Sequence, residues 1–201
     1  MSQQEIYGLL LAGGQSRRMG TDKALLRYDG GPTQIERASA LLKAVCPQVF
    51  LSLREGQNFP LPEGVTPIYD QLENCKGPLC GILSALQTHP QAHWLIIACD
   101  LPFLEKPALD KLIKEFRRST PRLIAYRSTH DSLPEPLCAI YPAGCGPRLL
   151  DLAEQLGKHC PRKLLIEEDA ELIEPVEANY LDNVNTPEEF AVANRNEPTP
   201  H

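Results

Sequence analysis

Long apolar runs are missing from this sequence. No run approaches the ~20 apolar residues that a helix needs to span a bilayer. The opening MSQQEIYG has neither a basic segment followed by an apolar one nor a lipidation signal. We therefore expect a soluble, cytoplasmic protein that does not engage a membrane.

Cysteines at CxxC spacing are missing as well. The cysteines number seven and are scattered, at positions 46, 75, 80, 99, 138, 145 and 160. An odd, scattered set disfavours a disulfide framework, a zinc knuckle and a thioredoxin-like redox pair. We expect reduced thiols, most of them buried as small apolar side chains.

An excess of positive charge is the third absence. Lysine and arginine total 20 against 26 aspartates and glutamates, so the net charge is −6. Such a chain has no general attraction to nucleic acid or membranes, and an anionic ligand needs a local basic site. Leu164 to Asn194 holds nine acids and no lysine or arginine. That segment predicts either a solvated acidic face or a dock for a basic partner.

What the sequence does contain is a regular alternation of apolar runs with segments of helical period. With 201 residues, 42% of them apolar, the chain can form one full domain. Alternating strands and helices predict a single Rossmann-like three-layer α/β/α domain with a mainly parallel sheet, spanning 1–195 and followed by a flexible tail at 196–201. The expected strands are Ile6–Leu11, Val49–Leu53, Val65–Tyr69, Trp94–Cys99, Leu123–Tyr126 and Pro136–Tyr141, and the expected helices are Gln34–Ala44, Leu79–Gln87, Pro107–Arg118 and Pro147–Leu156.

The first strand runs into a basic, glycine-rich loop, LAGGQSRRMGTDKALL. Three glycines, at 13, 14 and 20, frame a stretch in which Arg17, Arg18 and Lys23 outweigh Asp22. Glycines of this kind expose backbone N–H groups at the end of a strand, where an open parallel sheet binds its ligand. The spacing matches neither a P-loop nor the GxGxxG fingerprint. We predict a site for a phosphate chain; the alternative is a surface turn with solvated arginines.

Two further segments place chemistry at strand ends. In DQLENCKGPLCGILSAL, Gly77-Pro78 predicts a tight helix entry, and Gly81 indicates that something approaches the first helical turn closely. In HWLIIACDLPFL, the strand ends in Asp100, whose carboxylate is expected to face a cation or water. The alternative for Asp100 is a cap on the following helix.

The segment YLDNVNTPEEF carries Asn183 and Asn185 two residues apart. In extended chain they point the same way. The same letters also match the start of a helix, with a proline at the first position and acids in the first turn.

Taken together, these motifs resemble those of nucleotidyltransferases on a Rossmann-like sheet, and most closely the molybdenum cofactor guanylyltransferase family. The resemblance implies transfer of GMP from GTP to the terminal phosphate of molybdopterin, with release of pyrophosphate, use of Mg²⁺, and transient protein partners in cofactor delivery. For the site it implies that Gly13, Gly14, Arg18 and Lys23 hold the triphosphate, that Leu11, Ala12 and Asp70 belong to the nucleotide site, that Asp100 binds Mg²⁺, and that Asn183 and Asn185 lie on the acceptor side.

The sequence departs from the family pattern in a few places. Cys80 replaces a usual alanine, Ala98 replaces a proline, and Leu53 stands near the position of a usual asparagine. The last change removes a polar side chain beside the nucleoside, so a related enzyme using CTP, or a sugar or polyol phosphate acceptor, is the first alternative. A non-catalytic protein that binds GTP or molybdenum cofactor is the second. A phosphate nucleophile needs no general base, in keeping with histidines that form no triad.

Overall fold

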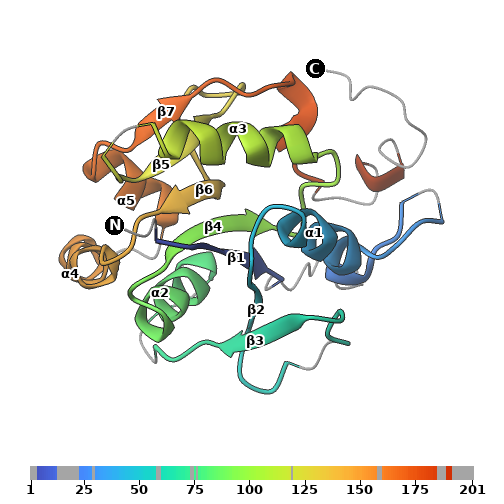
Figure 1. Ribbon diagram of the computed structural model, residues 1–201, viewed down its shortest axis with the longest axis horizontal. Helices are drawn as coiled ribbons and strands as arrows, with labels where there is room; N and C mark the ends of the chain where they lie inside the picture. Colours follow the sequence, from blue (N-terminus) through green and yellow to red (C-terminus); the bar gives the residue numbers. More distant parts are fainter. Residues whose placement is uncertain are drawn as a thin grey trace.

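The computed structural model describes residues 4–12, 23–28, 30–57, 60–72, 75, 77–118, 120–157, 160–184 and 189–191. Within these ranges the chain forms one seven-stranded sheet with helices on both faces (Figure 1). The elements, in chain order, are β1 Ile6–Leu11, η1 Lys23–Leu25, α1 Gln34–Lys43, β2 Val49–Leu53, β3 Val65–Tyr69, α2 Pro78–Thr88, β4 His93–Ala98, α3 Lys106–Phe116, β5 Ile124–Arg127, β6 Pro134–Tyr141, α4 Gly146–Leu156, α5 Pro161–Glu167, β7 Glu171–Ile173 and η2 Ala178–Leu181.

The sheet has the strand order β3-β2-β1-β4-β6-β5-β7. β3, β2, β1 and β4 are parallel neighbours, while β6 runs antiparallel to both β4 and β5. The chain leaves β1 toward β2 on one side and later returns to β4 on its other side. This reversal of strand order beside β1 is the point at which open α/β sheets bind ligands.

Two apolar layers hold the helices against the sheet. On one face, Leu42 of α1 and Leu109 of α3 pack with Leu10 of β1. On the other, Ile82 of α2 and Leu164 of α5 pack in a second cluster that also includes α4. Because β1 and β4 are covered on both faces, they read as continuous apolar runs and not as alternating ones. The predicted three-layer α/β/α domain with a mainly parallel sheet is confirmed.

The predicted elements are found with end shifts of at most two residues, and four short elements were missed: α5, β7 and the 3-10 helices η1 and η2. The first three strands match the prediction in full. α5 and β7 were not predicted, because a seven-residue helix without a side-chain cap and a three-residue strand leave too short a pattern. The predicted tail at 196–201 lies outside the described residues.

Other expectations concern thiols, membranes and the acidic segment. None of the seven cysteines forms a disulfide, and four of them are buried. In the described part of the chain, no helix is both long and apolar enough to cross a membrane. The acidic segment is partly neutralised within the chain, through the ion pairs Glu168–Arg148, Glu171–Arg122 and Glu174–Arg127. These pairs reduce the negative charge that a basic partner would meet.

Candidate active site

The candidate site lies along the carboxyl ends of β1 to β4. Asp70 directly follows β3 and Asp100 lies two residues beyond β4, so both carboxylates stand at the same edge of the sheet. β2 and β1 separate these two strands, which places them about 14 Å apart, three strand spacings of ~4.8 Å. That span is of the size of an extended ligand lying across the ends of β1 and β2.

Asp100 is held in place through its backbone and through the loop that follows it. The N–H of Val184 donates to the Asp100 carbonyl at 3.2 Å. The guanidinium of Arg37, on α1, donates to the carbonyls of Leu101 and Leu104. The cap predicted as an alternative role is not present: α3 begins at Lys106, and its N-cap residue is Glu105. Asp100 is therefore not a helix cap, and its half-buried carboxylate lies at the sheet edge.

Asp70 lies in a polar niche between β2 and α2. Its N–H donates to the Leu53 carbonyl at 2.9 Å, which extends the β2–β3 ladder by one residue. Burial raises the pKa of its carboxyl, and the Cys80 thiol, the Arg54 charge and the Ser52 hydroxyl act against that rise. The carboxylate is thus turned toward the first turn of α2, the segment that the GPLCG motif forms.

Gly81 of α2 packs closely against neighbouring strands of the sheet. The entry to α2 is as predicted, with Gly77 at φ 71° before Pro78 in the first helical position. A β-carbon built on Gly81 would collide with the Ser52 hydroxyl and lie 3.0 Å from Leu11 Cδ2. The close approach predicted from the sequence is therefore made by β1 and β2. The glycine lets α2 pack onto the strands that carry the site.

Gly81→Ala is expected to lower the free energy of unfolding by about 1–3 kcal/mol, because the added methyl overpacks this contact. Urea denaturation followed by circular dichroism measures the change. The matched control places Gly81→Ala in a Ser52→Gly background, which removes the colliding hydroxyl. The loss should then be smaller; an equal loss in both backgrounds would mean that Ser52 is not the source of the strain.

Three residues at the strand ends have buried side chains and can offer only backbone groups to the site: Leu11, Ala12 and Leu53. Leu11 and Ala12 are buried, one in each apolar layer, and the Leu11 carbonyl accepts the N–H of Cys99 at 3.2 Å. Leu53 is 3% exposed and packs in the core. The residue that replaces the family's asparagine therefore offers no side-chain contact, whereas its neighbour Ser52 faces Asp70.

Much of the glycine-rich loop lies outside the described residues. This applies to Gly13, Gly14 and Arg18, to the side chain of Lys23, and to Asn185 near the other end of the chain. The backbone of Lys23 begins η1, which contacts α1. The roles predicted for these residues in phosphate and acceptor binding remain predictions.

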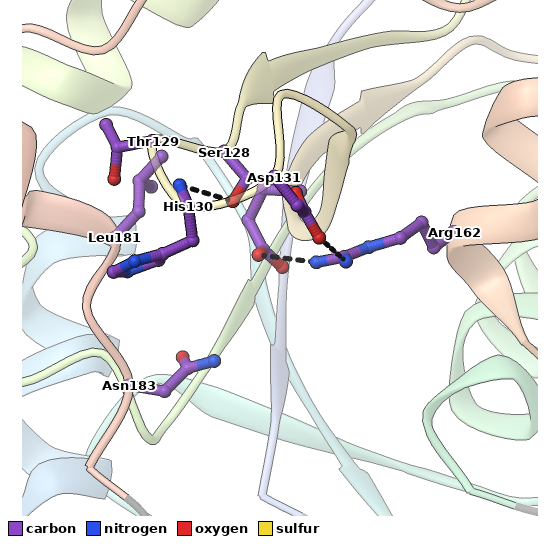
Figure 2. A pocket seen from close by; sticks show the side chains of 8 residues that line it. Ser128, Thr129, His130, Asp131, Arg162, Leu181 and Asn183 are labelled. Carbon is purple, nitrogen blue, oxygen red and sulfur yellow. Dashed lines mark hydrogen bonds and ion pairs between the residues drawn. The ribbon is translucent and has the colours of Figure 1, made fainter.

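A pocket of about 300 Å³ lies beside the end of β4. Its lining residues come from three separate segments: Ser128, Thr129, His130 and Asp131 from the β5–β6 turn with Glu135 of β6, Arg162 of α5, and Leu181 and Asn183 around the end of η2. Figure 2 shows Asn183 and His130 on one side of this pocket and Arg162 on the other. Asn183 directly precedes Val184, which binds the Asp100 backbone, so the pocket adjoins the candidate metal ligand.

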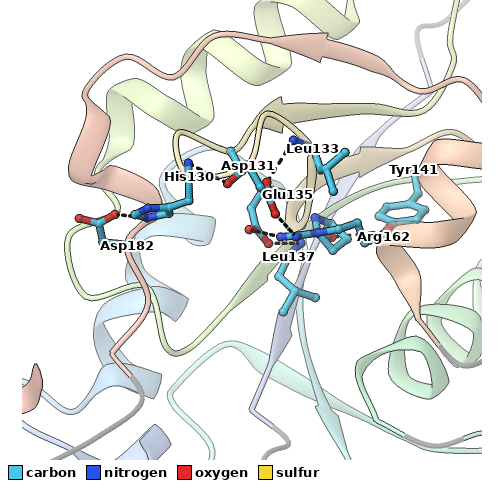
Figure 3. A network of polar contacts seen from close by, with 10 residues as sticks. His130, Asp131, Leu133, Glu135, Leu137, Tyr141, Arg162 and Asp182 are labelled. Atoms are coloured by element: carbon cyan, nitrogen blue, oxygen red, sulfur yellow. Dashed lines mark hydrogen bonds and ion pairs between the residues drawn. The ribbon is translucent and has the colours of Figure 1, made fainter. Parts of the chain in front are cut away.

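A network of charges around Arg162 lines the pocket (Figure 3). Arg162 contacts Asp131 Oδ2 at 2.7 Å and Glu135 Oε2 at 3.4 Å. Glu135 is 7% exposed, and its Oε1 accepts the Leu137 N–H at 3.2 Å. Burial raises the pKa of the Glu135 carboxyl, the Leu137 N–H and Arg162 oppose the rise, and the charges of Asp100 and Asp131 add to it.

The residues of this network were not among the site residues predicted from the sequence. His130 lies outside the sequence motifs, yet it lines the pocket, and its Nε2 lies 3.2 Å from Asp182 Oδ1. Glu135 begins the segment EPLCAIYP. A charged residue at the start of a strongly apolar strand was the available signal.

Comparison with known proteins decides the family. A model described as the MobA-like NTP transferase domain matches residues 8–172. The chain belongs to this family. It is a nucleotidyltransferase, and the predicted enzyme class and family resemblance are confirmed.

Curated relatives of this MobA-like transferase cover most of its length. It is 41% identical over 198 residues to a molybdenum cofactor biosynthesis bifunctional protein of Synechocystis, a match of 96% of this chain and 55% of that protein, so it spans about half of that relative. It is 32% identical to a molybdenum cofactor guanylyltransferase of Pseudomonas fluorescens, over 90% of this chain and 89% of the relative. A probable molybdenum cofactor guanylyltransferase of Rhodopirellula baltica is 31% identical, over 90% and 88%.

Solved structures share the fold. The molybdopterin-guanine dinucleotide biosynthesis protein A of Archaeoglobus fulgidus superposes with a TM-score of 0.75 at 22% identity, covering 94% of this chain and 97% of that one. A 2-C-methyl-D-erythritol 4-phosphate cytidylyltransferase of Thermus thermophilus gives 0.68 at 17% identity, covering 96% and 98%. At these identities the superpositions establish architecture and not substrate.

Proposed function

We propose that this MobA-like transferase moves GMP from GTP to the terminal phosphate of molybdopterin, giving the guanine dinucleotide cofactor and pyrophosphate. The observation that carries the proposal is the pocket beside Asp100. A pocket next to the strand ends where the nucleotide is expected supports a second substrate site, as a two-substrate transfer requires. The names of the curated relatives support guanine and molybdopterin as the pair of substrates. The proposal includes the cytoplasmic location expected from the sequence.

On the nucleotide side, the proposal assigns the triphosphate to the loop after β1. Gly13 and Gly14 supply backbone N–H groups, and Arg18 and Lys23 supply positive charge. The nucleoside lies toward β3, which carries Asp70 at its end. β3 is three strand spacings from β4, the strand that precedes Asp100. Leu11 and Ala12 contribute through their backbone, because their side chains are buried in the core.

The residues at the end of β4 fit a magnesium ion. Mg²⁺ prefers oxygen ligands and is commonly held by one or two carboxylates together with substrate phosphates and water. Among the described residues there is no cluster of three or more acidic, histidine or cysteine side chains that would form an all-protein cage. Asp100 supplies one carboxylate at the place where the phosphates are expected. When bound, Mg²⁺ would neutralise charge that develops on those phosphates.

The proposed chemistry is an in-line displacement at the α-phosphorus of GTP. An oxygen of the acceptor phosphate forms the new bond to that phosphorus, and the bond to the β-bridging oxygen breaks, so that pyrophosphate leaves with the electron pair. The acceptor phosphate has a second pKa near ~6 and is largely dianionic at neutral pH, so no residue has to remove a proton. The protein's task is to hold two anions in line and to offset their repulsion, which Arg18 and Lys23 are proposed to do.

On the acceptor side, Asn183 and Asn185 are proposed to face the acceptor. Asn183 is exposed and lines the pocket beside Asp100. An acceptor seated there would present its phosphate to the strand ends, with the rest of the molecule in the pocket.

We predict that GTP is the preferred nucleotide. Leu53 lies in the core, so recognition of the base depends on backbone groups near Leu11 and Ala12 and on the niche around Asp70. A missing polar pair typically costs ~1–3 kcal/mol, so selectivity should be reduced and not inverted. The measurement is pyrophosphate release from each of the four NTPs with Mg²⁺ and molybdopterin, expressed as kcat/KM.

The same assay separates the alternatives. A ratio of kcat/KM for GTP over CTP or ATP at or below one would place the chain with a nucleotidyltransferase of another base. Binding of GTP without turnover, with molybdopterin present, would indicate a carrier or sensor.

A further inference from the structure

The pocket beside Asp100 carries an excess of negative charge. Its lining residues include the carboxylates of Asp131 and Glu135 against the single guanidinium of Arg162, a balance of one negative charge with His130 neutral. Arg162 is closer to Asp131, at 2.7 Å, than to Glu135, at 3.4 Å. With respect to Arg162, Glu135 is thus the less closely paired of the two carboxylates, although it is the more deeply buried and its Oε1 also accepts the Leu137 N–H at 3.2 Å.

This balance determines what the pocket can hold. A phosphate placed there would meet two carboxylates and would have to draw Arg162 away from both. A carboxylate accepts hydrogen bonds and donates none, and its two oxygens can receive two adjacent N–H groups at once. The pocket therefore favours a neutral ligand with paired donors. Its volume of about 300 Å³ is at the lower end of small-molecule sites, which suits a fused bicyclic ring.

The pocket is also placed correctly for an acceptor whose phosphate reaches the strand ends. Asn183 lines it, and the next residue, Val184, binds the Asp100 backbone at 3.2 Å. Asp100 lies close enough to Glu135 for its charge to act on that carboxyl. A molecule with its ring against Glu135 can thus extend a phosphate arm toward Asp100.

We propose that Glu135 determines specificity for the acceptor, by accepting the amino and ring N–H donors of a 2-amino-4-oxo pyrimidine edge, the edge that a pterin presents. The phosphate of the acceptor stays outside this pocket, near Asp100. The inference rests on the proposed function, since it names how the acceptor is read. It adds to that function a residue that reads the acceptor. Because guanine presents the same donor edge, an effect on KM for molybdopterin and not on KM for GTP is what distinguishes the acceptor from the nucleotide.

The experiment uses two free ring systems as probes, so that binding is measured without turnover. Pterin carries the 2-amino donor, whereas lumazine has the same shape with a 2-oxo acceptor in its place. Quenching of probe fluorescence by the full chain is expected to show pterin bound about tenfold or more tightly than lumazine, the effect of one hydrogen bond to a charged group. Millimolar inorganic phosphate should not displace pterin.

Two matched variants separate recognition from a structural role. Glu135→Gln preserves shape but replaces one acceptor oxygen by a donor, and it is expected to lose the preference for pterin. Asp131→Asn weakens the closer contact to Arg162 on the more exposed side of the same network, and it should keep the preference. In the transfer assay, Glu135→Gln should raise KM for molybdopterin about tenfold and leave KM for GTP unchanged.

Each result decides the matter. Preference for pterin in wild type, lost only in Glu135→Gln, supports the inference. Equal binding of both probes to wild type, no binding of either, displacement by phosphate, or equal loss in both variants with a lowered melting temperature would overturn it. Failure of the proposed function has a different signature, because GMP transfer would be missing from wild type whatever the probes show.

Discussion

Asp100→Asn is expected to reduce Mg²⁺-dependent nucleotidyl transfer by on the order of 10³-fold or more. An amide is nearly the same shape as a carboxylate but is a poor ligand for Mg²⁺, which prefers charged oxygen donors beside substrate phosphates. Loss of metal-assisted charge stabilisation removes several kcal/mol from the transition state, at ~1.4 kcal/mol per decade of rate.

The fold should be retained in this variant. The contact that ties Asp100 to the C-terminal segment uses its backbone carbonyl, and Arg37 holds the carbonyls of the following loop. Neither contact involves the side chain that changes. Circular dichroism and the melting temperature are therefore expected to match wild type.

Calorimetric titration with GTP in the presence and absence of Mg²⁺ tests the assignment. Wild type should show tighter GTP binding with metal, and Asp100→Asn should bind GTP weakly and to the same extent with or without it. Asp110→Asn is the matched control, because Asp110 lies on the surface of α3 and pairs with Lys106. An unchanged magnesium dependence in Asp100→Asn would move the metal site to another residue.

Lys23→Ala is expected to reduce turnover by on the order of 10²-fold or more, because a cation positioned on the phosphates acts mainly as charge develops in the transition state. The position of Lys23 in the chain supports this role. Its backbone begins η1, whose next residue, Ala24, is fully buried and anchors the turn. The lysine therefore follows the glycine-rich loop at a point that the core holds in place.

Steady-state kinetics with GTP and molybdopterin measure the loss, which should appear in kcat more than in KM for GTP. Lys114→Ala, at an exposed position on α3, is the matched control and should leave both constants near wild type. Activity of Lys23→Ala within about threefold of wild type, less than 1 kcal/mol by the same arithmetic, would mean that the loop has another role.

Part of the candidate site could be predicted because its residues belong to single segments. Asp100 follows a continuous apolar strand, and in a parallel sheet the end of such a strand is where a ligand binds. Gly77 and Pro78 mark the start of α2 by their own backbone preferences. In these cases a short sequence pattern is enough to place the residue at the end of a strand or the start of a helix.

The reason for Gly81 could not be read from its own segment. The sequence indicates only that a β-carbon is not tolerated there. The atoms that forbid it belong to Ser52 and Leu11, which lie 29 and 70 residues earlier in the chain. Close packing across layers is a property of the assembled fold.

The sequence by itself determined the α/β class, most of the strands and helices, and the end of β4 as the place of an acidic ligand, because each depends on periodicity or on one short motif. Only the tertiary structure decided the make-up of the pocket. Glu135, Arg162 and Asn183 come from a strand, a short helix and a loop, and no spacing in the sequence links them. They meet because β6 inserts antiparallel between β4 and β5, which brings the β5–β6 turn, α5 and the C-terminal segment to the same end of the sheet as Asp100. A long-range arrangement of that kind is set by how the layers pack.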